Sequence, residues 1–301
     1  MAHLIYSIVE RLHSLDPATR EDSARALCSM CFEDAINRIS FADAGAIAPL
    51  VDMLSSPDAT LQEAAASALS NMCFMNAANR TYVATAGGIA PLISMLRSSN
   101  AVAHVAAMAV GNICYHNGTN RTAFANAGAV APLLTLLGSA DERLQEACGK
   151  AVGNMCADNA ANQTAFAEAG AGDMLIKLLG SSNERVLEVC ASALGHMCFL
   201  NDSNRALLAT SAIYPLVKLV GSSDVRVQEA AAGTVCILCF RNTTADMIIA
   251  IDPLVNLMHS SSETLQRISK VALRNLCDAN PNNIPIIVNA AGARPVKIVE
   301  W

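Results

Sequence analysis

The chain has 301 residues, of which 53% are hydrophobic, 4% are aromatic and 15% are charged, and its formal net charge is −6. This much apolar surface excludes intrinsic disorder, and an acidic balance without any run of Lys or Arg argues against nucleic acid as a partner. No apolar stretch reaches the 18 or so residues that a membrane-spanning helix needs, so we expect no direct insertion into a membrane.

The first predicted element is a helix from Leu4 to Leu15, and a motif of about 42 residues recurs after it. Each copy contains a turn of the form Ala-Gly-x-Ile-x-Pro-Leu, as in residues 44–50 and 86–92. A second signature, of the form Ala-Leu-Ser-Asn-Met-Cys, follows in each copy, as in residues 68–73 and 109–114. Self-similarity at a fixed period of this length is typical of solenoids.

Each period is expected to fold into three helices and no strand. A short first helix follows an Asn that is suited to N-capping and ends at a Gly, the usual residue after a helix C-terminus. The Asn positions are Asn37, Asn79, Asn120, Asn162 and Asn204, and the Gly positions are Gly45, Gly87, Gly128 and Gly170. A second helix has Pro in its first turn, where the missing N–H costs nothing, as at Pro49 and Pro215. A longer third helix carries apolar residues at helical spacing, such as Leu61, Ala65 and Leu69.

We predict a single solenoid over residues 1–301. It comprises a partial N-terminal repeat at 1–36, repeats at 37–78, 79–119, 120–161, 162–203, 204–241 and 242–282, and a partial C-terminal repeat at 283–301. The repeat that starts at Asn242 is three residues short before Ile251, so its first helix is expected to be shortened or distorted. The chain stops inside what would be another second helix, which suggests an excised array or a truncated cap.

The period and both signatures resemble the armadillo repeat over essentially the whole chain. The sequence is most similar to cytosolic vacuole-associated and plant armadillo arrays, and less similar to the nuclear-import adaptors. The resemblance implies an all-α, right-handed α-solenoid in which Asn side chains of the third helices hold the main chain of an extended partner segment. In this sequence that role falls to four residues, Asn71, Asn112, Asn154 and Asn275, and the ladder is broken at Ser29, His196 and Ile237.

The position of these Asn residues agrees with such a role. Each stands opposite the apolar residues two positions before and after it, so it faces away from the core and towards the concave surface. An Asn amide supplies one acceptor and two donors, which suits both the N–H and the C=O of an extended backbone. The alternative is that these amides bond only within the scaffold.

Three further columns flank the ladder. Four residues before the Asn, where import adaptors carry Trp, stand Arg25, Ser67, Met108, Lys150, Ser192, Gly233 and Val271, which disfavours recognition of nuclear signals. Eight residues before it stand Glu21, Glu63, His104, Glu146, Glu188, Glu229 and Arg267, either an acidic rim for a basic partner or ordinary solvated charge. Three residues after it stand Phe32, Phe74, Tyr115, Ala157, Phe199, Phe240 and Asp278, whose rings either cover the next repeat's first helix or offer apolar pockets to a partner.

The eleven cysteines favour a reducing compartment. Seven of them recur two residues after the Asn position, on the face expected to be buried, so we expect reduced core thiols rather than disulfides. The Cys-x-x-Cys pairs at Cys28 and Cys236 lie mid-helix without a second pair, so we expect no zinc site. The Asn-x-Ser/Thr sequons, such as Asn79-Arg80-Thr81, are attributed to helix capping rather than to glycosylation.

No arrangement of nucleophile, base and phosphate loop supports catalysis, so we expect no enzyme, cofactor or metal. The leading hypothesis is a cytoplasmic scaffold, with the nucleus as the alternative, whose concave groove holds an extended peptide. The second hypothesis is a spacer or self-associating array that acts through its open ends or its convex face, because uncapped repeats expose apolar surface.

Overall fold

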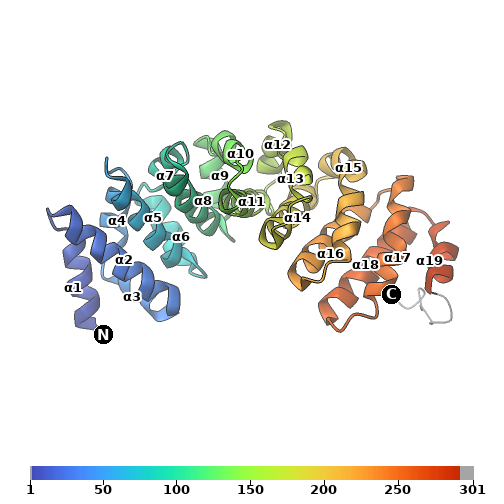
Figure 1. Ribbon diagram of the computed structural model, residues 1–301, viewed down its shortest axis with the longest axis horizontal. Helices are drawn as coiled ribbons and strands as arrows, with labels where there is room; N and C mark the ends of the chain where they lie inside the picture. The colour runs from blue at the N-terminus through green and yellow to red at the C-terminus, as the bar shows by residue number, and fades with distance from the viewer. Residues whose placement is uncertain (1, 292–301) are drawn as a thin grey trace. The chain divides into compact units, whose positions relative to one another are not determined.

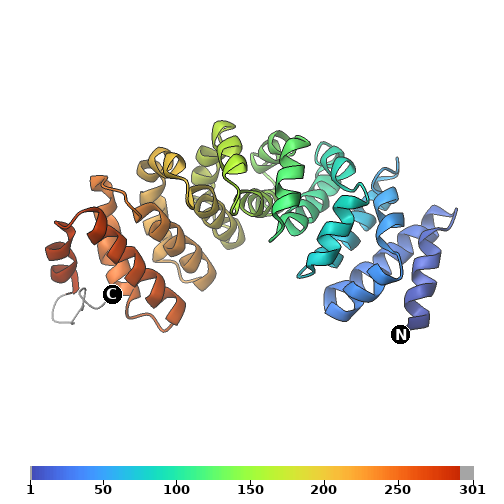
Figure 2. The same cartoon turned by 180° about the vertical axis from the view of Figure 1, so that it is seen from behind.

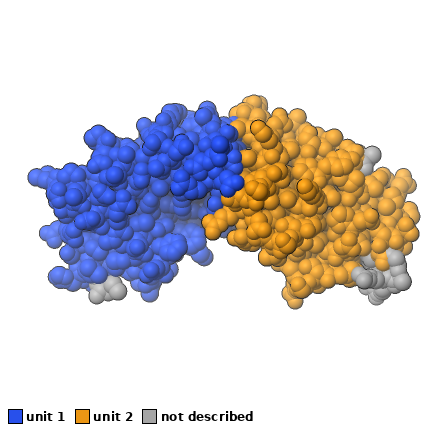
Figure 3. Space-filling view, viewed as in Figure 1, with its two compact units in different colours: residues 1–155 blue, residues 156–301 orange. Residues whose placement is uncertain are grey.

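The computed structural model describes residues 2–291, and every regular element in that range is a helix (Figure 1). The described chain forms two compact units, residues 1–155 and residues 156–301 (Figure 3). The predicted all-α solenoid is confirmed, since helices recur in the expected order in both units. No helix in the described range is long and apolar enough to span a membrane. The part of the predicted C-terminal repeat after Ala291 lies outside the described residues.

Unit 1 opens with a helix pair and continues with triplets of a first, a second and a third helix. The pair is α1 (Ala2–Leu12) and α2 (Pro17–Glu33). The triplets are α3 (Ala35–Asp43), α4 (Ile47–Met53) and α5 (Ala59–Cys73); α6 (Ala77–Thr85), α7 (Ile89–Met95) and α8 (Asn100–Cys114); and α9 (Gly118–Asn126), α10 (Val130–Leu137) and α11 (Glu142–Cys156).

Unit 2 continues the pattern with departures from it. Its elements are α12 (Ala160–Glu168), α13 (Ala171–Leu178), α14 (Glu184–Cys198), α15 (Asp202–Val220), α16 (Val225–Cys239), η1 (Ala245–Ala250), α17 (Ile251–Leu257), α18 (Glu263–Ala279) and α19 (Asn283–Ala291). The shortened first helix expected before Ile251 is confirmed, because η1 is a 3-10 helix of six residues.

The third helices stack on one another within each unit, as Figures 1 and 2 show from opposite sides. In unit 1, α2 packs on α5 and α5 packs on α8, and in unit 2, α14 packs on α16 and α16 packs on α18. Small residues allow close approach, since an ideal Cβ at Gly111 would lie 3.5 Å from the Ala151 backbone. The interior is aliphatic, with Leu69, Val110 and Leu273 fully buried.

The glycine after each short first helix does what the sequence predicts. Gly45 has φ +86°, in the left-handed region that favours glycine. Its N–H donates to the carbonyl of Ala42 (2.9 Å), and the N–H of Ala46 donates to the carbonyl of Phe41 (3.0 Å). These two bonds form a Schellman motif, which satisfies the last carbonyls of the helix and turns the chain into the second helix.

The repeat that begins near Asn204 lacks this glycine, and its first two helices are fused. Ser211 occupies the glycine position, four residues before the Pro, so no left-handed residue ends the first helix, and α15 runs unbroken through 19 residues. Pro215 therefore lies inside a helix. The sequence had suggested that it lies in the first turn of a separate second helix, which is wrong.

The predicted helix caps were misplaced by three residues. The residues that cap the first helices are Asp34, Asn76, Asn117, Asn159 and Asn201, whose side chains accept N–H bonds from the first turn. Asn79, for example, is the third residue of α6, and its own N–H donates to Oδ1 of the true cap, Asn76 (3.0 Å).

The Asn residues assigned as caps instead join neighbouring repeats. Asn79 is 1% exposed, and its Nδ2 donates to the carbonyls of Met72 (2.8 Å) and of Arg38 (2.8 Å). Met72 lies on the preceding third helix and Arg38 on the preceding first helix, so one amide uses both of its N–H groups to bind two other helices. Asn120 makes the same pair of bonds, as does Asn204.

The Arg that follows each joining Asn was not singled out from the sequence. Arg80 is 4% exposed, its Nε donates to the carbonyl of Cys73 (3.0 Å), and its guanidinium carbon lies 5.0 Å from the ring centroid of Tyr115. We call the Asn and the Arg together the inter-repeat joint: Asn37–Arg38, Asn79–Arg80, Asn120–Arg121 and Asn204–Arg205, with Asn162–Gln163 in the remaining repeat. Its signal is the recurrent Asn-Arg dipeptide.

The aromatic residues three positions after the Asn register therefore cover the first helix of their own repeat. The sequence had suggested that they cover the first helix of the next repeat. The ring of Phe74 lies 5.1 Å from the guanidinium of Arg38, and the ring of Phe240 lies 5.4 Å from that of Arg205. A buried guanidinium held over a ring gains cation–π energy. The rings nonetheless stay about half exposed, so contact with a partner is left open.

At the internal repeat junctions, a residue just after the third helix has a left-handed backbone conformation although it is not a glycine. These residues are Met75, His116, Asp158, Leu200 and Arg241, with φ between 47° and 54°. We expect Met75→Gly to raise the free energy of unfolding by about 0.5–1 kcal/mol, because Gly avoids the strain and the Met side chain is largely exposed. Urea denaturation beside Met75→Ala, which keeps the Cβ, checks this. A Gly variant less stable than the Ala variant would contradict it.

The thiols fall into two classes of accessibility. Cys28 and Cys236 are half-buried, while the other nine cysteines are buried, and burial raises the pKa of Cys73 to about 12. Because the thiolate is the reactive form, these nine should react slowly in the native state. We expect eleven reactive thiols in denatured protein and early labelling of Cys28 and Cys236 alone in native protein. A total several thiols short, or early labelling of Cys73, would contradict this.

Candidate functional site

The candidate site is one face of the third helices, made by the residues at the Asn register and at the positions four before and three after it. We call it the third-helix face. In unit 1 the Asn register holds Ser29, Asn71, Asn112 and Asn154, and in unit 2 it holds His196, Ile237 and Asn275.

In unit 1 every Asn of the register reaches back to the preceding third helix. Nδ2 of Asn71 donates to the carbonyl of Cys28 (3.0 Å), and Nδ2 of Asn154 donates to the carbonyl of Gly111 (2.9 Å). Nδ2 of Asn112 donates to the carbonyl of Ser70 (3.2 Å) and to its Oγ (2.9 Å). The acceptor carbonyl is always that of the residue just before the neighbouring register position.

These bonds use the amide only in part. Within residues 2–291, no hydrogen bond reaches Oδ1 of Asn71, Asn112 or Asn154, although each oxygen can accept two. The amide nitrogen of each Asn therefore bonds within the scaffold, as the second interpretation of the sequence held. The amide oxygen is left for another donor. Asn112 and Asn154 are each 8% exposed, so any ligand contact falls on a small, fixed part of the side chain.

Unit 2 carries a different register. Nδ2 of Asn275 donates to the carbonyl of Cys236 (3.1 Å), as the rungs of unit 1 do. Ile237 cannot make this bond, and the contact between α14 and α16 is made instead by Thr234, whose Oγ1 donates to the carbonyl of Ala191 (2.7 Å). His196 is half-buried on the same face. The interruption at Ile237 that the sequence predicts is therefore also a change in how the helices are joined.

The acidic column is mostly engaged by its neighbours. Glu21 forms an ion pair with Arg25 (2.8 Å), and Glu188 lies 3.8 Å from Arg226. Glu229 accepts a hydrogen bond from Ser262 (3.1 Å). Glu63 and Glu146 are half-buried in unit 1. Much of this charge is thus compensated, which reduces its attraction for a basic ligand.

The remaining predicted residues lie on the same face of unit 1. Met108, four residues before Asn112, is 40% exposed, and Lys150, four residues before Asn154, is exposed. Phe74 and Tyr115 end the third helices at 45% and 43% exposure. These four side chains border the rungs, with Met108 and Lys150 one helical turn away.

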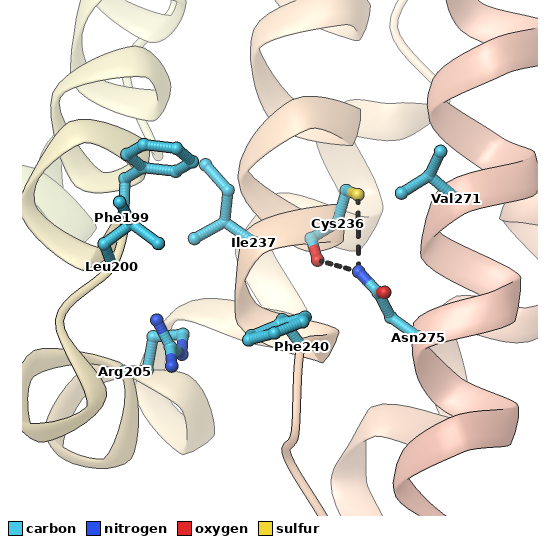
Figure 4. Close-up of a pocket in the computed structure, with 8 residues that line it drawn as sticks. All are labelled: Phe199, Leu200, Arg205, Cys236, Ile237, Phe240, Val271 and Asn275. Atoms are coloured by element: carbon cyan, nitrogen blue, oxygen red, sulfur yellow. Dashed lines mark hydrogen bonds between the residues drawn. The ribbon is translucent and has the colours of Figure 1, made fainter.

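Both units have depressions on the face. In unit 1 a depression of about 390 Å³ surrounds the first rung, with Arg25, Cys28, Phe32 and Asn71 among its walls. In unit 2 an apolar depression of about 300 Å³ lies beside Ile237 (Figure 4). Sequence reasoning missed the second one, although the apolar residue in an otherwise polar register was the signal for it.

The thiols of the face are poor metal ligands and poor nucleophiles. Burial raises the pKa of Cys28, and it raises that of Cys236 to about 11, which disfavours the thiolate that either role needs. Among residues 2–291, no three side chains of His, Cys, Asp or Glu are grouped so that they could hold a metal ion.

Comparisons with known proteins agree with this architecture. The family model described as the Armadillo/beta-catenin-like repeat matches residues 36–74, 119–157 and 159–199. A comparison with curated proteins gave no match. The crystal structure of an engineered protein is 28% identical, with a TM-score of 0.87 over 96% of this chain and 72% of that one.

Two designed armadillo repeat proteins are also similar. One is 27% identical, with a TM-score of 0.73 over 78% of this chain and 99% of that one. The other, solved in complex with the peptide (KR)4, is 26% identical, with a TM-score of 0.71 over the same shares. The narrower likeness to vacuole-associated and plant arrays is not addressed by these matches and stays a prediction. With its three-helix repeats, its glycine turns and these matches, the chain contains armadillo-type repeats at residues 36–74, 119–157 and 159–199 and has the all-α solenoid fold of the designed armadillo structures.

Proposed function

We propose that the third-helix face binds an extended segment of a partner protein and holds its main chain at the Asn rungs. The observation that carries the proposal is the row formed by Asn71, Asn112 and Asn154, all within unit 1. Each fixes its amide through Nδ2, which donates to the neighbouring helix, and keeps Oδ1 open. An oxygen held in a constant orientation is preorganised for a backbone N–H, so little entropy is lost when it binds.

The spacing of the rungs suits an extended chain. Packed helices lie about 8–10 Å apart, and alternate peptide units of an extended chain lie about 7 Å apart. Side chains of an extended segment point alternately towards and away from the face, so every second residue would meet the columns that flank the rungs. The designed relative solved with the peptide (KR)4 supports a peptide ligand for this kind of scaffold.

A basic ligand is the finer part of the proposal. Its support in this chain is the half-buried carboxylates Glu63 and Glu146 beside the unit 1 rungs and the overall charge of −6. The contribution should be small, because most carboxylates of the column, Glu146 included, have partners of their own. We also propose a cytoplasmic or nuclear scaffold without catalytic activity, which the reduced core thiols favour.

The second candidate function is self-association or spacing through the open ends. It is favoured by the apolar side chains at the N-terminal end, where Phe32, Ile36 and Ile39 are between 53% and 73% exposed. A preceding repeat or a second copy could cover them. Concentration-dependent mass by light scattering, abolished by Ile36→Lys and unaffected by changes to the rungs, would favour this function over peptide binding.

Backbone recognition can be tested on the ligand. We expect that a peptide selected on the full chain loses affinity by about 1 kcal/mol, roughly fivefold, for each N–H removed by N-methylation at alternate positions. Methylation at the intervening positions, whose N–H groups point away from the rungs, is the control. Fluorescence anisotropy with both sets of peptides measures the effect. Equal losses at all positions, or none, would contradict recognition of the main chain by the rungs.

A further inference from the structure

The apolar depression of unit 2 lies where the register changes from Asn to Ile237. Its walls come from the end of α14, from Arg205 of α15, and from α16 and α18, and include Phe199, Cys236, Ile237, Phe240 and Val271 (Figure 4). Phe199, Phe240 and Val271 are each between 40% and 46% exposed. Large apolar side chains gathered around a hollow on an otherwise polar face are a typical docking site for an apolar side chain, because covering them removes apolar surface from water.

A second depression of about 450 Å³ adjoins the first, since Phe240 and Asn275 line both. Arg241 lies in it, with its guanidinium carbon 5.2 Å from the ring centroid of Phe240. Asp278 lines it too, but its carboxylate is 3.7 Å from Nε of Arg274. Arg241 makes no ion pair within residues 2–291, so the charge left uncompensated here is positive.

Asn275 stands between the two depressions. Its Nδ2 donates to the carbonyl of Cys236, as Figure 4 shows, and no hydrogen bond within the described residues reaches its Oδ1. The backbone of a bound segment can therefore be held at Asn275 while side chains on either side of that point enter the two depressions. Residues two apart in an extended chain project to the same side about 7 Å apart.

We propose that this part of the third-helix face recognises a large apolar residue and an acidic residue two positions from it in an extended segment of a partner protein. The apolar side chain enters the depression beside Ile237, and the carboxylate meets Arg241. The proposal rests on the proposed function, since it needs the third-helix face to bind extended segments. It adds the chemistry of the side chains that unit 2 selects.

The first test selects ligands on the full chain from phage-displayed random peptides of about twelve residues, which span roughly 40 Å when extended. We expect enrichment of Leu, Ile, Met or Phe two positions from Asp or Glu. Val271→Trp fills the apolar depression and should abolish the apolar preference, while Arg241→Glu should replace the acidic preference by a basic one. Val225→Trp, at an exposed Val at the start of α16 that lines neither depression, is the matched control and should keep the motif.

The second test uses the two half-buried thiols as reporters of the two units. Cys236 lines the apolar depression and Cys28 lines the unit 1 depression beside Asn71. Peptides that carry the motif, at about ten times their Kd, should slow the alkylation of Cys236 by N-ethylmaleimide by roughly tenfold, since about one site in ten is then free. Site-resolved mass spectrometry measures both rates in the same sample.

The outcomes separate the two proposals. Protection of Cys28 without Cys236, or a motif that survives Val271→Trp, would overturn this inference and leave the unit 1 rungs as the binding site. Protection of Cys236 alone, by peptides that bind unchanged when the unit 1 rungs are removed, would overturn the rung mechanism instead. Protection of neither thiol would overturn both. Protection of Cys236 by raised protein concentration alone would show that a second copy fills the depression, against the proposal.

Discussion

Replacing Asn71, Asn112 and Asn154 together by Ala is expected to weaken the binding of an extended peptide by about 3 kcal/mol, which is more than a hundredfold in Kd. Each rung offers an oriented Oδ1 to a backbone N–H, and each such bond contributes on the order of 1 kcal/mol. Fluorescence anisotropy with a peptide selected on the parent chain measures the change.

The same variant should also lose stability, because each Nδ2 donates to a carbonyl of the neighbouring helix. The matched control is the replacement of Gln62, Gln145 and Gln228 by Ala. Each Gln lies nine residues before the register position, about 180° round the helix, and donates to a loop carbonyl. The control should lose comparable stability and keep its affinity. Equal affinity in the two variants would show that the rungs serve the scaffold alone.

The inter-repeat joint should give the largest stability effect of a single substitution. Asn120→Ala is expected to lower the free energy of unfolding by about 3 kcal/mol, because it leaves the carbonyls of Arg80 and Ile113 without a buried donor. Asn117, the true cap of α9, is three residues away and only half-buried, so Asn117→Ala should cost only about 1 kcal/mol. Urea denaturation of both variants gives the comparison.

Comparing Asn120→Ala with Asn117→Ala shows whether Asn120 joins two repeats or caps α9. If Asn120 capped α9, as the sequence suggested, its replacement would cost about as much as an ordinary cap, and Asn117 would matter less. A larger loss from Asn117→Ala than from Asn120→Ala would therefore contradict the role of Asn120 as a joint. Binding at the third-helix face should be unchanged in both variants as long as they remain folded.

The order of helices could be predicted from the sequence because each turn has its own local signature. The Gly of the Ala-Gly-x-Ile-x-Pro-Leu turn, as at Gly45, takes a left-handed conformation, and the first helix ends there. The fusion of two helices in α15 agrees with Ser211 standing where the other repeats have Gly, but Pro215 within the fused helix argued against it from the sequence alone.

The joint could not be predicted in the same way. Asn76 and Asn79 are both chemically suited to cap α6, and the local sequence gives no reason to choose between them. The choice is made by carbonyls in other helices, since the amide of Asn79 reaches Arg38, which is 41 residues earlier in the chain. Only the packing of one repeat on the next brings these groups together.

The candidate site could be predicted from the sequence in part. That the rungs face away from the core follows from helical periodicity, and the interruption at Ile237 is visible in the sequence. The bond from each rung to the preceding helix depends on how closely the third helices approach one another. The apolar depression depends on side chains from α14, α16 and α18 together, so no single segment reveals it.

The side-chain amide resonances of the rungs test the central claim most directly. In a two-dimensional ¹H–¹⁵N NMR spectrum, addition of a selected peptide should shift the Nδ2–H signals of Asn71, Asn112 and Asn154, because their amides contact the ligand. The buried joint amides of Asn79 and Asn120, assigned through Ala variants, should stay in place. Tight peptide binding that leaves all three rung signals unmoved would contradict recognition of the partner by the Asn rungs.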